Sequence, residues 1–423
     1  MERKSLVLEV ELVEPEKAEP MLAPYRVLEL TDDKGFYCGQ LLGSLGADVI
    51  KIERPGGDPA RNIGPFFHDI PDPEKSLFWL ALNSNKRGVT LNIEAANGKE
   101  IFKKLAKTAH AVVESFPPGY MDSLGLGYSE LDKINPGVIM TSISPFGQTG
   151  PYRDYQASDL ICWAMGGLLD LSGDPDRPPV RISHIPLAFL MGGMDAAWGT
   201  VIALFWGGKS GKGQQVDVSL QESMAKTIHA SKEHRGSSFY DIPQAEVSLQ
   251  VVWRIKDGHV YIMLHDGALG MRENPILVRW IEDAGMADDF IKGLNWDGFH
   301  WRDKSQEEID RIQGYFARFF ETKTKKQIIE EARSRQIVIQ PINSPRDVLE
   351  HPQLEARNYW QNLEHAELGA SICYPGRFCL PSETACKLWR RAPLIGEHNQ
   401  EVYQKELGLS DKDFAALKQE GII

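Results

Sequence analysis

The stretch YRVLELTDDKGFYCGQLLGSLGADVIKIERPGGDPAR, residues 25–61, decides the fold. Short runs at 25–30 and 47–53 predict two strands, because each is rich in aliphatic residues and ends at turn-forming residues. Between them, apolar side chains recur at helical spacing over residues 35–46. A strand, a helix and a second strand in this order predict a parallel strand pair joined by a crossover helix.

The same alternation continues toward the C-terminus. Apolar runs predict three more strands, and an amphipathic pattern predicts one more helix between the first two of them. The strands are at 88–93, 110–116 and 137–147, and the helix is at 97–109. Repeated units of this kind predict an α/β fold whose mostly parallel sheet is covered by helices on both faces. The turns after parallel strands meet at one edge of such a sheet, which is where ligands bind.

The second half of the chain has a different character. VVWRIKDGHVYIML (251–264) predicts a hairpin around Asp257-Gly258, and acidic, aromatic helical segments follow it. These features predict a second, smaller α+β domain at 225–335. Residues 336–423 return to strand, loop and helix character. We therefore divide the chain into an N-terminal extension at 1–24, a large domain at 25–224, the small domain and this C-terminal segment.

The composition of the chain argues against several classes of binding partner and location. Lys and Arg number 47 against 59 Asp and Glu, and the formal charge of −12 argues against nucleic acid. The five cysteines include no CxxC pair, and residues 1–20 lack the apolar core of a secretion signal. Residues 185–208 are apolar enough for a membrane span, but Pro186, several glycines and Asp195 favour a buried helix. We therefore expect a cytoplasmic protein that binds neither membrane nor nucleic acid.

Several well-known ligand motifs are absent from the sequence. GGKSGKG at 207–213 resembles a phosphate-binding loop, but that motif needs a glycine at the position of Ala203. No GxGxxG motif follows the first strand, and the chain has no GxSxG or HExxH motif. We therefore expect no metal site and no permanently bound cofactor.

Asp159 is the carboxylate that stands out in the middle of the chain. On local sequence alone it opens a predicted helix at 158–173, where a negative charge favours the helix dipole. Its context adds more, because recognisable motifs lie on both sides of it. They are GADVIKIERPGGDPAR (46–61), NSNKRGVTLNI (83–93), GQTGPY (147–152) and APLIGEHNQEVYQKELGLS (392–410).

In this order, the motifs resemble those of the family III CoA-transferases, from about residue 25 to the C-terminus. This family contains the formyl-CoA:oxalate, carnitine and arylsuccinate CoA-transferases and α-methylacyl-CoA racemase. The resemblance implies a large Rossmann-like domain that the segment 336–423 completes, a small domain, and two chains interlocked as a dimer. It also implies that Asp159 is the nucleophile and that CoA, a substrate, lies along the large domain over the loop after the first strand. The residues expected to contact CoA are Arg54, Leu91, Asn92, Ile93, Ser115, Phe116 and Tyr120.

Arg54 and Arg61 also stand out by themselves. They flank the tight turn PGGDP (55–59), which follows a predicted strand. Guanidinium groups suit the phosphates of CoA, so we predict that both arginines bind it. The alternative is solvated charge beside a turn. Lys86 and Arg87, which precede a predicted strand, are similar candidates.

A carboxylate at position 159 suits the transfer of CoA between acids. It can attack a thioester to give a mixed anhydride, and the released thiolate can then form an aspartyl-CoA thioester. We predict transfer from an acyl-CoA donor to a free carboxylic acid; family analogy suggests succinyl-CoA with an aryl- or alkyl-substituted succinate. One alternative is an acyl-CoA racemase or epimerase, although Ala157-Ser158-Asp159 departs from the racemase Gly-His-Asp. Another is a non-catalytic subunit. The assembly is expected to be a homodimer, or a heterodimer or heterotetramer with a homologous subunit.

Overall fold

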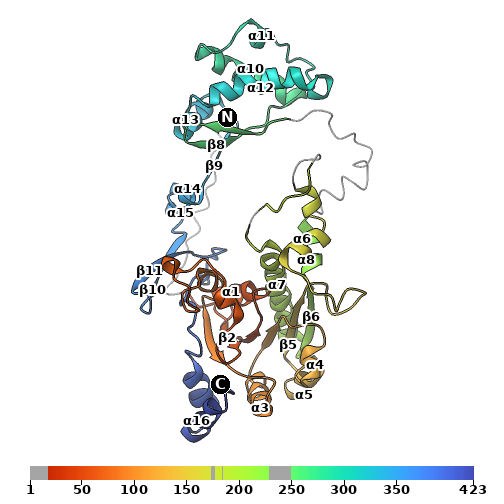
Figure 1. Cartoon of the computed structure of the whole chain (residues 1–423), viewed down its shortest axis with the longest axis vertical. Coiled ribbons are helices and arrows are strands. Elements are labelled where there is room, and N and C mark those ends of the chain that lie inside the picture. The colour runs from red at the N-terminus through yellow and green to blue at the C-terminus, as the bar shows by residue number, and fades with distance from the viewer. Residues whose placement is uncertain (1–17, 173–176, 183, 228–248) are drawn as a thin grey trace. The chain divides into compact units, whose positions relative to one another are not determined.

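The computed structural model describes residues 18–172, 177–182, 184–227 and 249–423 (Figure 1). The chain forms two compact units. The first consists of Met1–Ser231 and Asn358–Ile423, and the second of Lys232–Arg357. Most of the predicted extension at 1–24 lies outside the described residues. Of its last residues, Leu22 is buried and Pro20 forms a bridge with Ala385.

The first unit is built on a six-stranded sheet with the order β3-β2-β1-β4-β5-β6. Every neighbouring pair in it is parallel, which confirms the predicted α/β class. Because β1 lies between β2 and β4, the strand order reverses there, and a crevice opens beyond the carboxyl ends of these strands. The strands are β1 (Arg26–Leu30), β2 (Asp48–Glu53), β3 (Lys86–Thr90), β4 (Ala111–Glu114), β5 (Ile139–Ser144) and β6 (Gln214–Ser219).

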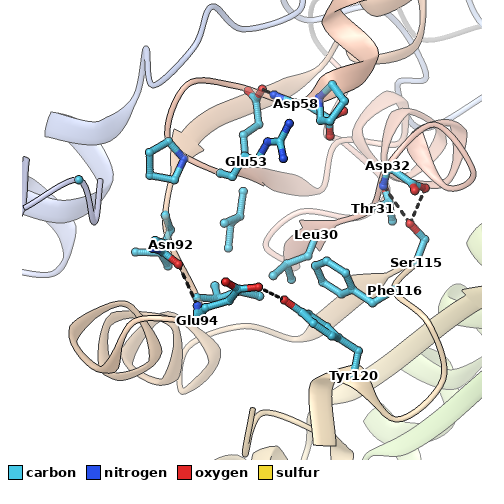
Figure 2. Close-up of a pocket in the computed structure, with 17 residues that line it drawn as sticks. Leu30, Thr31, Asp32, Glu53, Asp58, Asn92, Glu94, Ser115, Phe116 and Tyr120 are labelled. Atoms are coloured by element: carbon cyan, nitrogen blue, oxygen red, sulfur yellow. Dashed lines mark hydrogen bonds between the residues drawn. The ribbon is translucent and has the colours of Figure 1, made fainter. Parts of the chain in front are cut away.

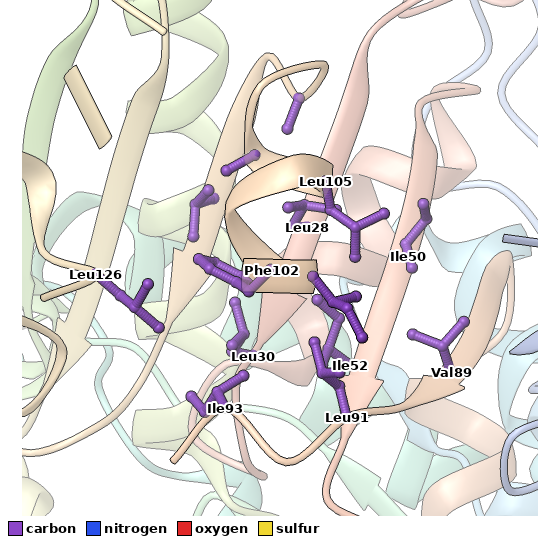
Figure 3. Close-up of a cluster of buried hydrophobic side chains, with 14 of the residues drawn as sticks. Leu28, Leu30, Ile50, Ile52, Val89, Leu91, Ile93, Phe102, Leu105 and Leu126 are labelled. Atoms are coloured by element: carbon purple, nitrogen blue, oxygen red, sulfur yellow. The ribbon is translucent and has the colours of Figure 1, made fainter. Parts of the chain in front are cut away.

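Two hydrophobic clusters join helices to this sheet. One cluster contains Phe102 and Leu105 of α3 (Ala96–Ala106), which pack with Leu28 and Ile50 of the strands (Figure 3). The chain's last residues, Ile422 and Ile423, belong to the same cluster, so the C-terminal segment completes the core of the first unit. The other cluster joins the sheet to α1 (Phe36–Ser44), α6 (Asp159–Met165), α7 (Leu187–Ser210) and α8 (Leu220–Thr227).

The remaining elements of the first unit are short. The helices are α2 (Leu77–Leu82), α4 (Tyr120–Ser123), α5 (Tyr128–Ile134), the π-helix η6 (Gln400–Glu406) and α16 (Asp411–Gln419), and β10 (Trp360–His365) pairs with β11 (Ala370–Pro375) in a hairpin. Short 3-10 turns are η1 (Pro59–Asn62), η2 (Phe67–Asp69) and η3 (Leu169–Leu171). The predicted helix 158–173 is too long, because α6 ends where Gly167 turns to a φ of +86°.

Helix α7 is the apolar segment 185–208 of the sequence. Among the described residues it is the one helix long and apolar enough to cross a membrane, and half of its most apolar window is buried. Gly193 lets it approach α1, because a β-carbon there would lie 3.0 Å from Cβ of Tyr37. Thr200 bonds Thr141 of β5 at 2.7 Å. The helix therefore packs into this unit, as predicted.

The second unit has its own sheet and an aromatic core. β7 (Val252–Ile255), β8 (Gly258–Tyr261) and β9 (Gln340–Ile342) pair antiparallel, so the predicted hairpin is confirmed. Residues 336–357 fall in this unit, not with the large domain, because β9 pairs with β8. The helices are α10 (Gly267–Asp283), α11 (Asp289–Lys292), η5 (Trp301–Asp303), α12 (Gln306–Phe320), α13 (Lys325–Arg335), α14 (Pro345–Leu349) and α15 (Pro352–Ala356).

Candidate active site

A cavity of about 540 Å³ lies at the carboxyl ends of β1, β2 and β4, the reversal point of the sheet (Figure 2). Of the residues predicted to contact CoA, Arg61 and the further candidates Lys86 and Arg87 lie outside this cavity, and all the others line it. The full lining is Leu30, Thr31, Asp32, Ile52, Glu53, Arg54, Pro55, Asp58, Pro59, Leu91, Asn92, Ile93, Glu94, Ser115, Phe116, Tyr120 and Gly421. The sequence therefore brings these residues to one site because they follow neighbouring parallel strands.

One wall of the cavity is aromatic. The rings of Phe116 and Tyr120 lie 4.7 Å apart, and the Tyr120 hydroxyl donates a 2.6 Å hydrogen bond to Glu94 (Figure 2). Burial and this carboxylate raise the pKa of Tyr120 to about 12, so its hydroxyl stays protonated at neutral pH. Gly119 makes this arrangement possible, because its φ of +82° turns the chain into α4 immediately before Tyr120.

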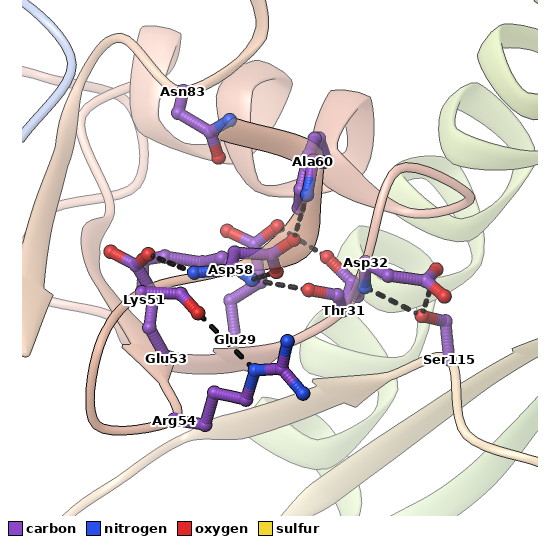
Figure 4. Close-up of polar contacts among 12 residues, drawn as sticks. Glu29, Thr31, Asp32, Lys51, Glu53, Arg54, Asp58, Ala60, Asn83 and Ser115 are labelled. Carbon is purple, nitrogen blue, oxygen red and sulfur yellow. Dashed lines mark hydrogen bonds and ion pairs between the residues drawn. The ribbon is translucent and has the colours of Figure 1, made fainter. Parts of the chain in front are cut away.

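A second wall is formed by two loops that bond to each other. The Ser115 hydroxyl donates to Asp32 at 2.8 Å, and the backbone N–H of Asp32 donates back to the Ser115 oxygen at 2.8 Å (Figure 4). Below them, the ammonium of Lys51 donates to the Thr31 carbonyl and lies 3.5 Å from Asp58. The loop after β1 is therefore fixed from both sides. Lys51 was not predicted, although a lysine inside an apolar strand is a visible signal of a buried partner.

Arg61 lies outside the cavity, and its side chain pairs with carboxylates of the protein itself. Its guanidinium is 1% exposed, pairs with both oxygens of Glu53 at 2.7 and 2.8 Å, and reaches Glu74 at 2.7 Å. It also lies over the Trp79 ring, 3.8 Å from the ring centre. A guanidinium with these partners is already neutralised. Its effect on the site is therefore indirect, because Glu53 also accepts the backbone N–H of Asp58 at 2.8 Å.

Lys86 and Arg87 are also paired with carboxylates of the protein itself. The Lys86 ammonium is fully buried and donates to Glu29 at 2.9 Å, while burial lowers its pKa to about 8. Arg87 pairs with Asp48 at 2.7 Å and with Glu401 at 2.7 Å. Neither residue lines the cavity. Within the described part of the chain, Arg54 is the one cation in the cavity wall, and its side chain is held by a 3.3 Å bond to the Gly57 carbonyl.

Asp159 lies at the first position of α6, behind the capping residue Ser158. Its side chain is 9% exposed. Oδ1 accepts the backbone N–H groups of Ala188 and Phe189 at 2.8 and 3.4 Å, and Oδ2 accepts Nη2 of Arg181 at 3.0 Å. Burial raises the pKa of Asp159 above its usual value of 3.8, while the two amides and the guanidinium oppose that rise.

Asp159 does not line the cavity, but the loop after β1 links the two places. Burial and the charge of Asp159 raise the pKa of the Cys162 thiol to about 12, and the ammonium of Lys34 opposes that rise. Asp32 of this loop lines the cavity, and the loop leads into α1, which packs with α6 and α7 in one hydrophobic cluster. Sequence reasoning missed Arg181, because only the fold brings it to the Asp159 helix.

A doubly wound sheet with a cavity at its reversal point defines a nucleotide-binding type of α/β protein. Comparison with known proteins is more specific. The description "CoA-transferase family III" applies to a family profile that matches residues 22–399. The chain belongs to this family and is a CoA-transferase.

Individual relatives agree with this assignment. The chain is 35% identical to the succinyl-CoA:(R)-benzylsuccinate CoA-transferase subunit BbsE of Thauera aromatica, over 89% of this chain and 92% of the relative. It is 30% identical to the succinyl-CoA–D-citramalate CoA-transferase of Chloroflexus aurantiacus, over 94% of this chain and 97% of the relative. A crystal structure of a CaiB/BaiF family protein from Brucella suis superimposes with a TM-score of 0.77 at 25% identity, covering 92% of this chain and 100% of that chain.

Proposed function

We propose that the protein moves CoA from succinyl-CoA to an aryl- or alkyl-substituted succinate, with Asp159 as the nucleophile. The observation that carries the proposal is the cavity that gathers Arg54, Asn92, Ser115 and Tyr120 at the reversal point of the sheet. The choice of succinyl-CoA rests on two relatives whose names contain that donor.

The proposed chemistry follows from the surroundings of Asp159. The carboxylate attacks the succinyl-CoA carbonyl, giving a mixed anhydride and CoA thiolate. The thiolate then attacks the Asp159 carbonyl carbon, releases succinate, and leaves an aspartyl-CoA thioester. The acceptor acid repeats these steps in reverse and leaves as its CoA thioester. Nucleophilic attack needs the ionised carboxylate, which the amides of Ala188 and Phe189 and the guanidinium of Arg181 stabilise.

CoA is proposed to lie in the cavity with its phosphates near Arg54. The Phe116 and Tyr120 rings offer an apolar face. The cavity carboxylates Glu53 and Glu94 already have hydrogen-bond partners in Arg61 and Tyr120. The loop that carries Asp32 leads from this cavity into α1, which packs with α6 and α7 in one hydrophobic cluster. CoA thus acts as a substrate, and the proposed reaction requires no resident cofactor.

The proposed assembly contains a second chain of the same family, either another copy or a homologous subunit. One face of α7 supports it, because its large apolar side chains are 56–68% exposed. They are Trp198, Ile202, Phe205 and Trp206, which recur at helical spacing. Relatives named as subunits are consistent with either arrangement. We further propose a cytoplasmic location, in keeping with five free cysteines.

The test is a screen of carboxylic acids against succinyl-CoA, with product masses recorded. We expect release of succinate and a new acyl-CoA for at least one substituted succinate. Asp159→Asn abolishes this turnover, whereas Asp289→Asn, at the same first position of helix α11, leaves it unchanged. Deuterium uptake from solvent at the α-carbon, without any acceptor acid, would instead identify a racemase. Turnover that begins only after a homologous subunit is added would select the heteromeric assembly over the homodimer.

A further inference from the structure

The two oxygens of Asp159 are held by different groups. Oδ1 accepts the backbone N–H groups at the start of α7, from Ala188 at 2.8 Å and Phe189 at 3.4 Å. Oδ2 is bonded by the guanidinium of Arg181 at 3.0 Å. The backbone groups keep their positions through any reaction of the carboxylate, whereas a side chain can change its partner. Oδ1 should therefore keep its hydrogen-bond partners during the reaction, whereas Oδ2 can lose its partner.

The reaction removes the charge that Arg181 neutralises. This step rests on the proposed function. When Asp159 attacks a thioester, Oδ2 becomes the bridging oxygen of the anhydride, and it leaves with the donor acid when the thiolate attacks. Oδ1 remains as the thioester carbonyl oxygen, still facing the amides of Ala188 and Phe189, which stabilise the negative charge of the tetrahedral intermediates that form at the Asp159 carbonyl carbon. The guanidinium, which keeps its proton throughout, then faces a neutral group.

Arg181 is placed to stay at the site when its partner is lost. The same Nη2 also donates to the carbonyl oxygens of His184 and Ile185, both at 3.2 Å. Its side chain is 34% exposed, against 9% for Asp159, so a solute can reach the guanidinium before it reaches the carboxylate. A second donor is at hand, because the buried indole N–H of Trp163 favours the ionised form of Asp159 yet forms no hydrogen bond in the described structure.

We propose that Arg181 is the binding group for the carboxylate of the incoming acid. In the resting enzyme it pairs with Asp159, and in the aspartyl-CoA thioester it pairs with the acid that attacks next. A guanidinium binds either carboxylate in the same way. The acid therefore binds poorly until Asp159 has lost its charge, which enforces the order donor first, acceptor second. The acid's attacking oxygen then takes the place that Oδ2 has left.

The test measures binding and needs no turnover. Asp159→Asn keeps the side chain's shape and removes its charge, as thioester formation does. We measure the affinity of succinate by titration calorimetry for the wild type, for Asp159→Asn, and for Asp159→Asn combined with Arg181→Gln. Asp159→Asn should bind succinate at least about tenfold more tightly than the wild type, the effect of one charge-assisted hydrogen bond. The added Arg181→Gln change should cancel this gain, and Arg181→Lys should keep part of it.

The controls separate this proposal from a purely structural role. Adding Arg390→Gln, a change of an exposed arginine, should leave the gain intact, and CoA affinity should stay equal in all variants. Equal succinate affinity with and without Arg181, in the Asp159→Asn background, would overturn the proposal and leave Arg181 a support for Asp159. The binding measurement and the transfer assay also test separate claims. Loss of the binding pattern with normal transfer overturns only the role of Arg181, while an intact pattern without transfer overturns only the proposed function.

Discussion

Replacing Arg54 by alanine is the change that most directly probes the proposed CoA cavity. Arg54 is the one cation lining the cavity within the described residues, and its Nε is bonded to the Gly57 carbonyl at 3.3 Å. The two terminal nitrogens therefore remain for a phosphate. A charge-assisted hydrogen bond contributes about 1.5–3 kcal/mol, and the exposed position of Arg54 puts it at the lower end. We expect CoA to bind roughly 10- to 20-fold more weakly in the variant.

The assay is titration calorimetry with CoA at two salt concentrations. The affinity of the wild type should fall with salt more steeply than that of Arg54→Ala, because the variant lacks one screened contact. Arg54→Lys should recover part of the loss. Lys133→Ala, which removes an exposed cation of α5, is the matched control and should leave the affinity unchanged. A change below threefold for Arg54→Ala would refute our placement of the phosphates.

Three further changes test the framework around the site. Lys86→Met should destabilise the protein by about 3–5 kcal/mol in chemical denaturation, because it leaves the buried Glu29 unpaired, and adding Glu29→Gln should restore most of the loss. Burial raises the pKa of Glu114 from 4.5 to about 7. The folded protein therefore binds this proton more tightly than the unfolded chain does, and the resulting contribution to the free energy of unfolding is complete below pH 4.5 and is lost as the pH rises through 7. Glu114→Gln should therefore exceed wild-type stability by up to about 3 kcal/mol at pH 8, with no difference near pH 4; a constant difference would contradict this. Gly98→Ala should lower both melting temperature and CoA affinity, because its β-carbon would lie 1.8 Å from the Asn92 carbonyl oxygen, and unchanged values would refute this contact.

Much of the fold could be predicted because its signals are local. The central strands β1, β4 and β5 are largely apolar runs, and the turns after parallel strands fall at one edge of the sheet. The family resemblance implies that Asn92, Ser115 and Tyr120 contact CoA, and the parallel strands bring these residues together because each lies beyond the carboxyl end of a strand. The cavity follows from strand order, which the alternation of strands and helices restricts strongly.

The parts that could not be predicted depend on distant partners. Arg61 carries the same local signal as Arg54, and only the fold shows that Glu53 and Glu74 neutralise it. Strand β3 begins at Lys86, two residues before the predicted start. Lys86 can lie in a buried strand because Glu29 pairs with it in the core, and this partner is not visible in the local sequence. The pairing of Arg181 with Asp159 likewise has no counterpart in the local sequence.

The central claim is that Asp159 becomes covalently linked to CoA, and peptide mass spectrometry tests it most directly. The enzyme is mixed with succinyl-CoA without an acceptor acid, treated with hydroxylamine, and digested. We expect a hydroxamate on the Asp159 peptide, absent when CoA replaces succinyl-CoA. An unmodified Asp159 peptide, together with intact transfer by Asp159→Asn, would contradict the account.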